Sequence, residues 1–159
     1  MRKIRFNTFE TNSSSTHTLC ICSKEKYDKW NNGELYYWDN NNNFYTAEEL
    51  KVLIKEMIFK NKINTDYKNK TIEYKGVIKN YENHKDKNKK IREFMSKEEI
   101  ELITDEEVKE YYEKNIDRYD LPITIEKYFD DENLETYKKD YTTENGDKIV
   151  VFGKYGSDW

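Results

Sequence analysis

Both ends of the chain alternate between apolar and polar residues, as half-buried strands do. The alternation covers residues 3–9 and 17–22 near the N-terminus, and 136–143 and 148–152 near the C-terminus. The last two segments predict a hairpin, because the turn at 144–147 contains Asn-Gly. We therefore expect an α+β fold in which short N- and C-terminal strands form one antiparallel sheet packed by several helices.

The middle of the chain follows a helical period instead. Apolar residues recur with helical spacing between 50 and 58, directly after a capping box at Thr46–Glu49. Similar boxes at Ser96–Glu99 and Thr104–Glu107 predict two further helices, and Ser23 predicts the start of a short one.

The remaining segments are less regular. We interpret 34–38 as a strand and 60–70 as a basic loop. Residues 71–78 read as a strand broken at Gly76, and 81–90 as a polar segment that is weakly helical or mobile.

The composition favours a folded, strongly solvated chain. Only 35% of the residues are hydrophobic and 38% are charged, which is typical of disordered proteins. However, 14 Tyr, 7 Phe and 3 Trp supply large side chains for a core. We expect a single domain over 1–159, with a possible acidic helical sub-region at 96–133. Because no long apolar segment is present, we expect a cytoplasmic protein without membrane association.

The charges divide the chain into a basic and an acidic part. Residues 51–95 carry 13 Lys or Arg against 6 Asp or Glu, whereas residues 96–145 carry 7 against 17. Such an asymmetry steers charged partners, although a solvated surface accounts for it equally well. The two cysteines, Cys20 and Cys22, are too close for a disulfide and have no second pair for zinc, so we expect buried thiols and neither metal nor cofactor.

The densest polar chemistry lies in residues 9–17, between two apolar segments. Glu10 and His17 have the side chains of a general base and a general acid, and Arg5 can hold a phosphate through two parallel bonds. These are the parts of a metal-independent ribonuclease. Further donors to a phosphate are the polar residues between them, Asn12, Ser13, Ser14, Ser15 and Thr16. A self-satisfied polar turn explains the same residues without any ligand.

Two other interpretations of these residues stay open. Ser14-Ser15-Thr16 is superficially similar to the Ser-Thr-Ser strand of ADP-ribosyltransferases, which would imply a nucleotide or NAD site. Near the C-terminus, the strand that ends in two glycines would bring Lys154 and Tyr155 to the polar turn if it pairs beside it.

The basic segment 60–92 interleaves cations with Tyr67, Tyr74 and Tyr81 at equal spacing. Single-stranded nucleic acid needs this combination, because cations neutralise phosphates and rings stack on bases. The acidic segment 98–113 offers the opposite possibility, since a row of carboxylates can occupy a basic groove on a protein partner.

The opening phrase Phe9-Glu-Thr-Asn-Ser-Ser-Ser-Thr-His17 resembles the start of a group of small proteins from phages, mobile elements and Firmicutes. Residues 29–35, 44–49 and 152–156 are also similar to that group, and Thr18 stands where Ser is commoner. Some proteins of this kind resemble anti-CRISPR factors, which implies an RNA or ribonucleoprotein partner such as a CRISPR effector.

These observations lead to one expected function and two alternatives. We expect a counter-defence protein that cleaves or binds the guide RNA of a nucleoprotein, with Glu10, His17 and Arg5 as the catalytic group. The first alternative is a stoichiometric inhibitor that binds an effector protein through its acidic helices and has no enzymatic turnover. The second is a nucleotide- or NAD-binding transferase.

Overall fold

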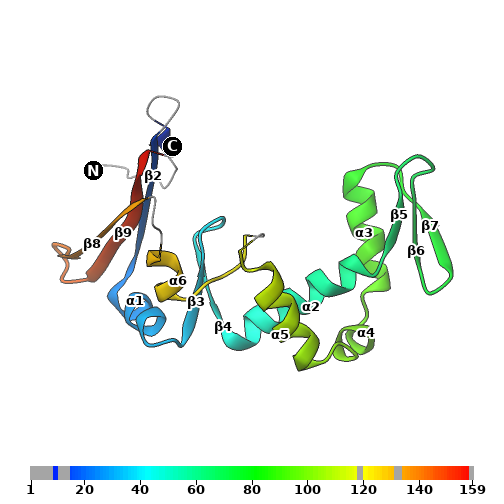
Figure 1. Cartoon of the computed structure of the whole chain (residues 1–159), viewed down its shortest axis with the longest axis horizontal. Coiled ribbons are helices and arrows are strands. Elements are labelled where there is room, and N and C mark those ends of the chain that lie inside the picture. The colour runs from blue at the N-terminus through cyan, green and yellow to red at the C-terminus, as the bar shows by residue number, and fades with distance from the viewer. Residues whose placement is uncertain (1–8, 11–14, 118–119, 131–133, 158–159) are drawn as a thin grey trace. The chain divides into compact units, whose positions relative to one another are not determined.

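The computed structural model describes residues 9–10, 15–117, 120–130 and 134–157 (Figure 1). The chain divides into two compact units, one made of residues 1–47 and 120–159 and the other of 48–119. Helices and antiparallel strands occur in both, so the predicted α+β class is confirmed.

The first unit is built on a four-stranded antiparallel sheet in the order β1-β2-β9-β8. Its elements are β1 (Phe9–Glu10), β2 (Ser15–Ser23), α1 (Lys24–Asn31), β3 (Leu35–Trp38), β4 (Asn43–Thr46), α6 (Ile125–Phe129), β8 (Glu135–Thr142) and β9 (Lys148–Ser157). The sheet joins strands from both ends of the chain, as the alternating patterns predict. Strands β3 and β4 form a separate hairpin.

Two local features fix this sheet. The turn between β8 and β9 is closed by Thr143, whose N–H donates to the Asp147 carbonyl at 2.8 Å, and Gly146 has a φ of 86°. On β9, Gly153 lies against the backbone of β2: an added Cβ would be 1.8 Å from the Thr18 carbonyl oxygen. Only glycine allows this close approach, so Gly153 is required for the pairing of β2 with β9.

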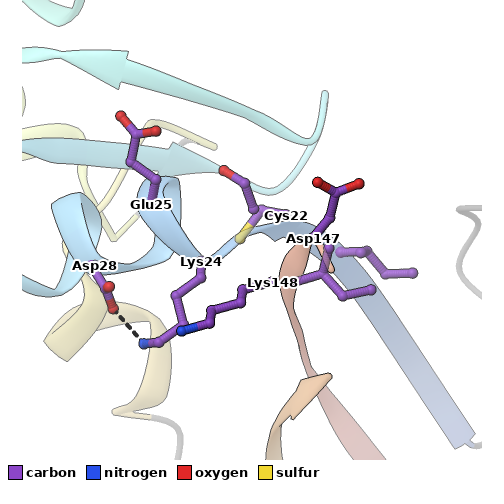
Figure 2. Close-up of a pocket in the computed structure, with 9 residues that line it drawn as sticks. Cys22, Lys24, Glu25, Asp28, Asp147 and Lys148 are labelled. Carbon is purple, nitrogen blue, oxygen red and sulfur yellow. Dashed lines mark hydrogen bonds and ion pairs between the residues drawn. The ribbon is translucent and has the colours of Figure 1, made fainter. Parts of the chain in front are cut away.

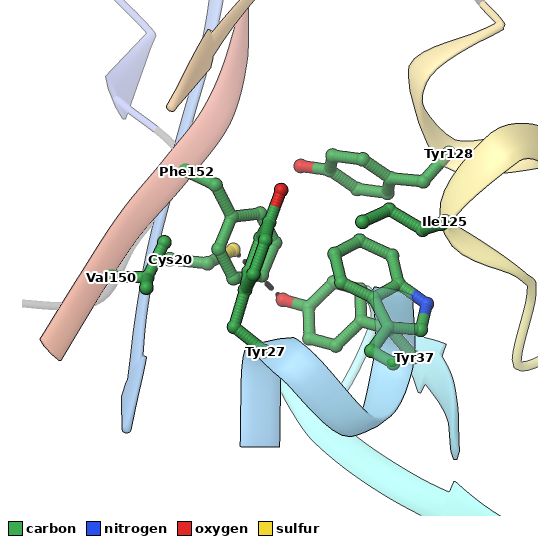
Figure 3. Packing of buried hydrophobic residues seen from close by; sticks show 8 residues of the cluster. Cys20, Tyr27, Tyr37, Ile125, Tyr128, Val150 and Phe152 are labelled. Carbon is green, nitrogen blue, oxygen red and sulfur yellow. Dashed lines mark hydrogen bonds between the residues drawn. The ribbon is translucent and has the colours of Figure 1, made fainter. Parts of the chain in front are cut away.

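The core of the first unit is aromatic (Figure 3). Trp30 of α1 is 1% exposed, and its ring centroid lies 5.2 Å from that of Phe152 and 5.4 Å from that of Tyr128. Its indole N–H donates to the Ile123 carbonyl at 3.1 Å, and Ile123 also pairs with Tyr37 through two backbone bonds of 2.9 Å. Segments distant in sequence thereby share one set of rings.

The second unit has a mainly aliphatic core. Its elements are α2 (Ala47–Asn61), β5 (Asn64–Asp66), β6 (Thr71–Tyr74), β7 (Val77–Asn80), α3 (His84–Phe94), α4 (Lys97–Glu101) and α5 (Asp105–Asn115). Strands β5, β6 and β7 form an antiparallel sheet. The buried cluster comprises Phe59, Ile63, Ile72, Ile91 and Ile103. Helix α2 follows the predicted helical period, and the capping box at Thr104 is present.

The predicted loop at 60–70 is wrong, and the predictions for 71–78 and 81–90 are only partly right. The expected loop at 60–70 contains β5, and the expected broken strand at 71–78 is the hairpin of β6 and β7. Lys75 and Gly76 at its turn have φ values of 47° and 79°, the two positive angles that a tight hairpin favours. The polar segment at 81–90 leads into α3, which forms because Ile91 packs into the core and Asn83 caps the helix.

Candidate nucleic-acid interface

The three equally spaced tyrosines of the basic segment have different environments. The ring of Tyr74 lies 4.9 Å from that of Phe59 and 5.9 Å from that of Phe94, between centroids. Its hydroxyl donates to Glu99, which also pairs with Lys75 at 2.9 Å. These two donors hold the pKa of Glu99 below its usual value. Tyr74 is therefore a packing residue and is not available to stack on a base.

Tyr67 and Tyr81, by contrast, share one cation. The ammonium of Lys87 lies 4.5 Å from the ring centroid of Tyr67 and 5.8 Å from that of Tyr81. The Tyr67 side chain is 76% exposed. Lys87 also donates to the Tyr67 hydroxyl at 3.5 Å. This bond and the attraction between a cation and aromatic rings hold the three side chains together. The arrangement presents one charge and one open aromatic surface at the same place.

Two further lysines complete the site through backbone carbonyls. Lys70 donates to the Glu82 carbonyl at 3.4 Å, and Lys90 donates to the Asn80 carbonyl. The backbone N–H of Tyr81 donates to the carbonyl of Lys70 at 2.9 Å, so Tyr81 and Lys70 lie next to each other. We call the set of Tyr67, Lys70, Tyr81, Lys87 and Lys90 the tyrosine–lysine patch.

One carboxylate accompanies the patch. Asp86 accepts from the backbone N–H of Glu82 at 2.9 Å and lies 3.4 Å from the Lys90 ammonium. The N–H bond, followed by Lys90, lowers the pKa of Asp86. No described carboxylate forms an ion pair with Lys70 or Lys87, so the patch keeps a positive surplus.

Local sequence explains why Tyr67 stands out from the surface. It occupies the turn between β5 and β6, where Asp66 accepts from the backbone N–H of Asn69 at 3.0 Å and from its side-chain amide at 2.8 Å. Lys70 ends the turn with a φ of 51°. Asx-type bonds of this kind build tight turns, and the residue between them points away from the core.

Lys87 was not identified from the sequence, although its spacing from an apolar residue of the same helix indicates its position. It lies one turn before Ile91 on α3, so both residues share a helix face. For the tyrosines, Tyr74 lies two residues after the buried Ile72 on β6 and shares its strand face. That spacing separates Tyr74 from the exposed Tyr67, whereas Tyr81 is half-buried and also packs against the core.

The N-terminal candidates are only partly described. Arg5, Asn12, Ser13 and Ser14 lie outside the described residues. Glu10 lies on β1 and the segment 15–17 on β2, and the structure describes their backbone alone.

The strand register places these positions relative to one another. Glu10 is the Cα partner of Thr16, and Phe9 is the Cα partner of His17. Glu10 and His17 thus lie on adjacent strands without being directly paired. The catalytic roles of Glu10, His17 and Arg5, and the phosphate contacts of Asn12, Ser13, Ser14, Ser15 and Thr16, stay predictions.

The C-terminal candidates lie beside the opening strands. Tyr155 is the Cα partner of His17, and Lys154 that of Thr18. The Lys154 ammonium is 4.4 Å from the ring centroid of Tyr128. The Tyr155 hydroxyl donates to the carboxylate of Glu135, which raises the pKa of the phenol. Tyr155 is therefore a neutral, partly exposed donor near the start of the chain.

A hollow of about 850 Å³ lies at the opposite end of β2 (Figure 2). Lys24 and Asp28 in its wall form an ion pair at 2.8 Å. Burial raises the pKa of the Cys22 thiol, which also lines it, to about 11. A thiol that stays protonated at neutral pH is a poor nucleophile, so Cys22 is not an activated nucleophile in this hollow.

The cysteines are thiols, as predicted: Cys20 is buried and Cys22 half-buried. The Cys20 sulfur lies 2.8 Å from the Tyr37 hydroxyl. Within the described residues, no group of three or more His, Cys, Asp or Glu side chains is placed to hold a metal ion. No helix in the described part of the chain has the length and apolar character that a membrane crossing requires.

Comparison with known proteins adds no assignment. No protein-family model, curated protein or solved structure matches the chain. The function is therefore inferred from the chain's own residues.

Proposed function

We propose that this chain binds single-stranded RNA through the tyrosine–lysine patch, as a counter-defence protein acting on an RNA-guided nucleoprotein. The observation that carries the binding step is the Lys87 ammonium held at 4.5 and 5.8 Å from two tyrosine rings. Rings stack on unpaired bases without regard to sequence, and lysines neutralise the phosphates between them. A duplex hides its base faces, so the open ring of Tyr67 favours a single strand.

The counter-defence step has a different support. It rests on the resemblance of residues 9–17 to the opening of small phage and mobile-element proteins. Guide RNA is the single-stranded nucleic acid that such a protein meets in an effector. The substrate we propose is therefore the exposed part of a guide RNA.

A binding titration tests the first step. Fluorescence anisotropy with a labelled, unstructured RNA should show saturable binding, weakened by salt, while a duplex of the same length binds more weakly. Lys87→Gln should weaken binding by about tenfold, since it removes a phosphate contact and the cation that orders both rings. Lys109→Gln, an exposed lysine of α5, is the matched control and should leave the affinity unchanged. An equal loss of affinity in both variants would mean that RNA binding depends on general charge attraction and not on the patch.

A cleavage test addresses the catalytic form of the proposal. Its support is that Glu10 and His17 occur on adjacent strands, a base and an acid of the types that transesterification needs. Purified protein in excess over a structured RNA, with EDTA present, should then cut the RNA, and His17→Ala should abolish the cut. Intact RNA under these conditions would exclude ribonuclease activity and leave RNA binding as the proposed function.

The acidic-helix alternative has its own supporting observation. Glu106 and Glu110 lie one turn apart on α5 and are exposed. Glu107 differs, because its carboxylate accepts from the backbone N–H of Thr104 at 2.8 Å and caps the helix. In an effector-inhibition assay, Glu106→Lys with Glu110→Lys should abolish inhibition under this alternative. Under RNA binding, the same double variant keeps its inhibition and Lys87→Gln loses it.

A further inference from the structure

Strand β8 lies at one edge of the four-stranded sheet, with β9 as its neighbour. All of its residues, Glu135–Thr142, are exposed. Among the residues that the structure describes, no strand pairs with its other edge. An open edge presents unpaired N–H and C=O groups, and these groups take up another strand unless the side chains oppose it.

The side chains of β8 divide between two faces. On one face Lys138 pairs with Asp140 at 3.1 Å. On the other face the hydroxyls of Tyr137 and Tyr141 lie 3.3 Å apart, and the Lys139 ammonium is 5.1 Å from the ring centroid of Tyr141. The charged pair and the tyrosine pair are both centred on Lys139. The strand is therefore nearly symmetric about that residue in the types of side chain it carries.

Antiparallel pairing restricts how two such strands can meet. In an antiparallel pair, two directly opposite residues either both point their N–H and C=O groups towards the neighbouring strand or both point them away. Because this direction alternates along a strand, the twofold axis that relates two copies of one strand must pass at the level of a residue and not between two residues. An axis through Lys139 places Lys138 opposite Asp140 twice, Tyr137 opposite Tyr141 twice, and Thr136 opposite Thr142 twice. An axis through Lys138 or Asp140 loses both the Lys–Asp and the Tyr–Tyr pairs.

We infer that β8 pairs antiparallel with β8 of a second copy of this chain, about a twofold axis through Lys139, and so extends the sheet. Opposite charges and aromatic pairs directly across two strands stabilise such an arrangement. The side chains of one strand supply both partners of every pair except the central one. This self-complementarity selects a second copy over an unrelated strand.

The central pair opposes two lysines. Like charges directly opposite weaken a strand pair, although the Tyr141 ring attracts each Lys139 ammonium. The contact is also short, since it covers only residues 136–142 of each copy. Small contacts are typical of weak assemblies. The dimer should accordingly be populated at high concentration and dissociate on dilution.

A charge-swap experiment on the full chain tests this pairing. Lys138→Asp places Asp opposite Asp in a dimer, and Asp140→Lys places Lys opposite Lys, so each variant alone should be monomeric. Mixed together, the two variants restore both cross-strand pairs and should form a heterodimer. Within each chain the altered residues stay like-charged, so only pairing between chains predicts the recovery.

The measurement is sedimentation equilibrium from about 1 µM to about 1 mM, with circular dichroism to check that each variant is folded. Native chain should dimerise at the upper end, and Lys139→Thr should dimerise at least tenfold more tightly because it removes the central repulsion. Native chain that stays monomeric throughout overturns the inference. So does a mixture of the two variants that fails to associate while native chain dimerises.

Discussion

The buried cores of the two units differ in their use of tyrosine. In the first unit Tyr37 and Tyr128 are 0% and 1% exposed and surround Trp30. In the second unit the core is mainly aliphatic, and Tyr67 is left on the surface beside a lysine. A high tyrosine content therefore indicates neither a core nor a binding site by itself. Burial of each ring, and the charge beside it, decides which role it takes.

Removal of a core ring should give the largest effect on this comparison. Trp30→Ala leaves a cavity among the surrounding rings and should lower the free energy of unfolding by about 3–5 kcal/mol. Tyr67→Ala, on the surface of the second unit, should change it by less than about 0.5 kcal/mol. Urea denaturation followed by circular dichroism measures both. Similar losses in the two variants would contradict the division between core and surface rings.

The next largest effect concerns the sheet that supports the aromatic core. Gly153→Ala drives a methyl group into the Thr18 carbonyl, where a Cβ would lie at 1.8 Å, and should cost about 3 kcal/mol or more. Gly33→Ala is the matched control, because nothing lies within 4 Å and only its φ of 80° is strained. That strain alone costs about 1–2 kcal/mol. A control as damaging as Gly153→Ala would mean that backbone angle, and not close approach, limits this sheet.

The third effect is expected at alkaline pH, which should destabilise the first unit through its cysteine thiols. Burial raises the pKa of Cys20 and of Cys22 from 9.0 to about 11 in the folded state. The folded chain holds these protons more tightly, so their contribution to stability is complete below pH 9.0 and is lost as pH rises towards 11. Trp30 and Trp38, the tryptophans among the described residues, both belong to the first unit, so tryptophan fluorescence reports its unfolding.

The same denaturation series on Cys20→Ala provides the control. Its midpoint should fall less steeply between pH 9 and pH 11 than that of the native chain, because one titrating thiol is gone. An identical pH profile in the variant would show that this thiol does not couple to folding.

The smallest effect is a change in salt dependence at the patch. Lys70→Gln and Lys90→Gln should each reduce the slope of log affinity for single-stranded RNA against log salt by about 0.7. Lys109→Gln should leave the slope unchanged. Anisotropy titrations at several salt concentrations measure it. If the slope is the same in all three variants, the patch lysines do not contact phosphate.

Sequence patterns were sufficient where a local rule decides the structure. Ser23 and Thr104 cap helices as predicted, and Asn-Gly turns the hairpin of β8 and β9. They were insufficient where tertiary contacts decide. Helix α3 is polar along most of its length and forms because Ile91 packs into the core.

The candidate site shows the same division between what local patterns predict and what tertiary contacts decide. Equal spacing of Tyr67, Tyr74 and Tyr81 made them look equivalent, yet Tyr74 packs against Phe59. Within the predicted strand at 71–78, the two-residue period places Tyr74 on the same face as Ile72, and this signal distinguishes it from Tyr67. Lys87 reaches the rings of Tyr67 and Tyr81 from a helix that the sequence indicates only weakly. Contacts between elements of this kind have no local signature.

The central claim is that the exposed ring of Tyr67 stacks on RNA, and the affinities of Tyr67→Ala and Tyr67→Phe test it most directly. Stacking predicts a loss of about 5- to 100-fold for Tyr67→Ala. Tyr67→Phe keeps the ring and should stay close to native, as should Val77→Ala, which removes an exposed apolar side chain from the same small sheet. Native affinity in Tyr67→Ala would contradict the account.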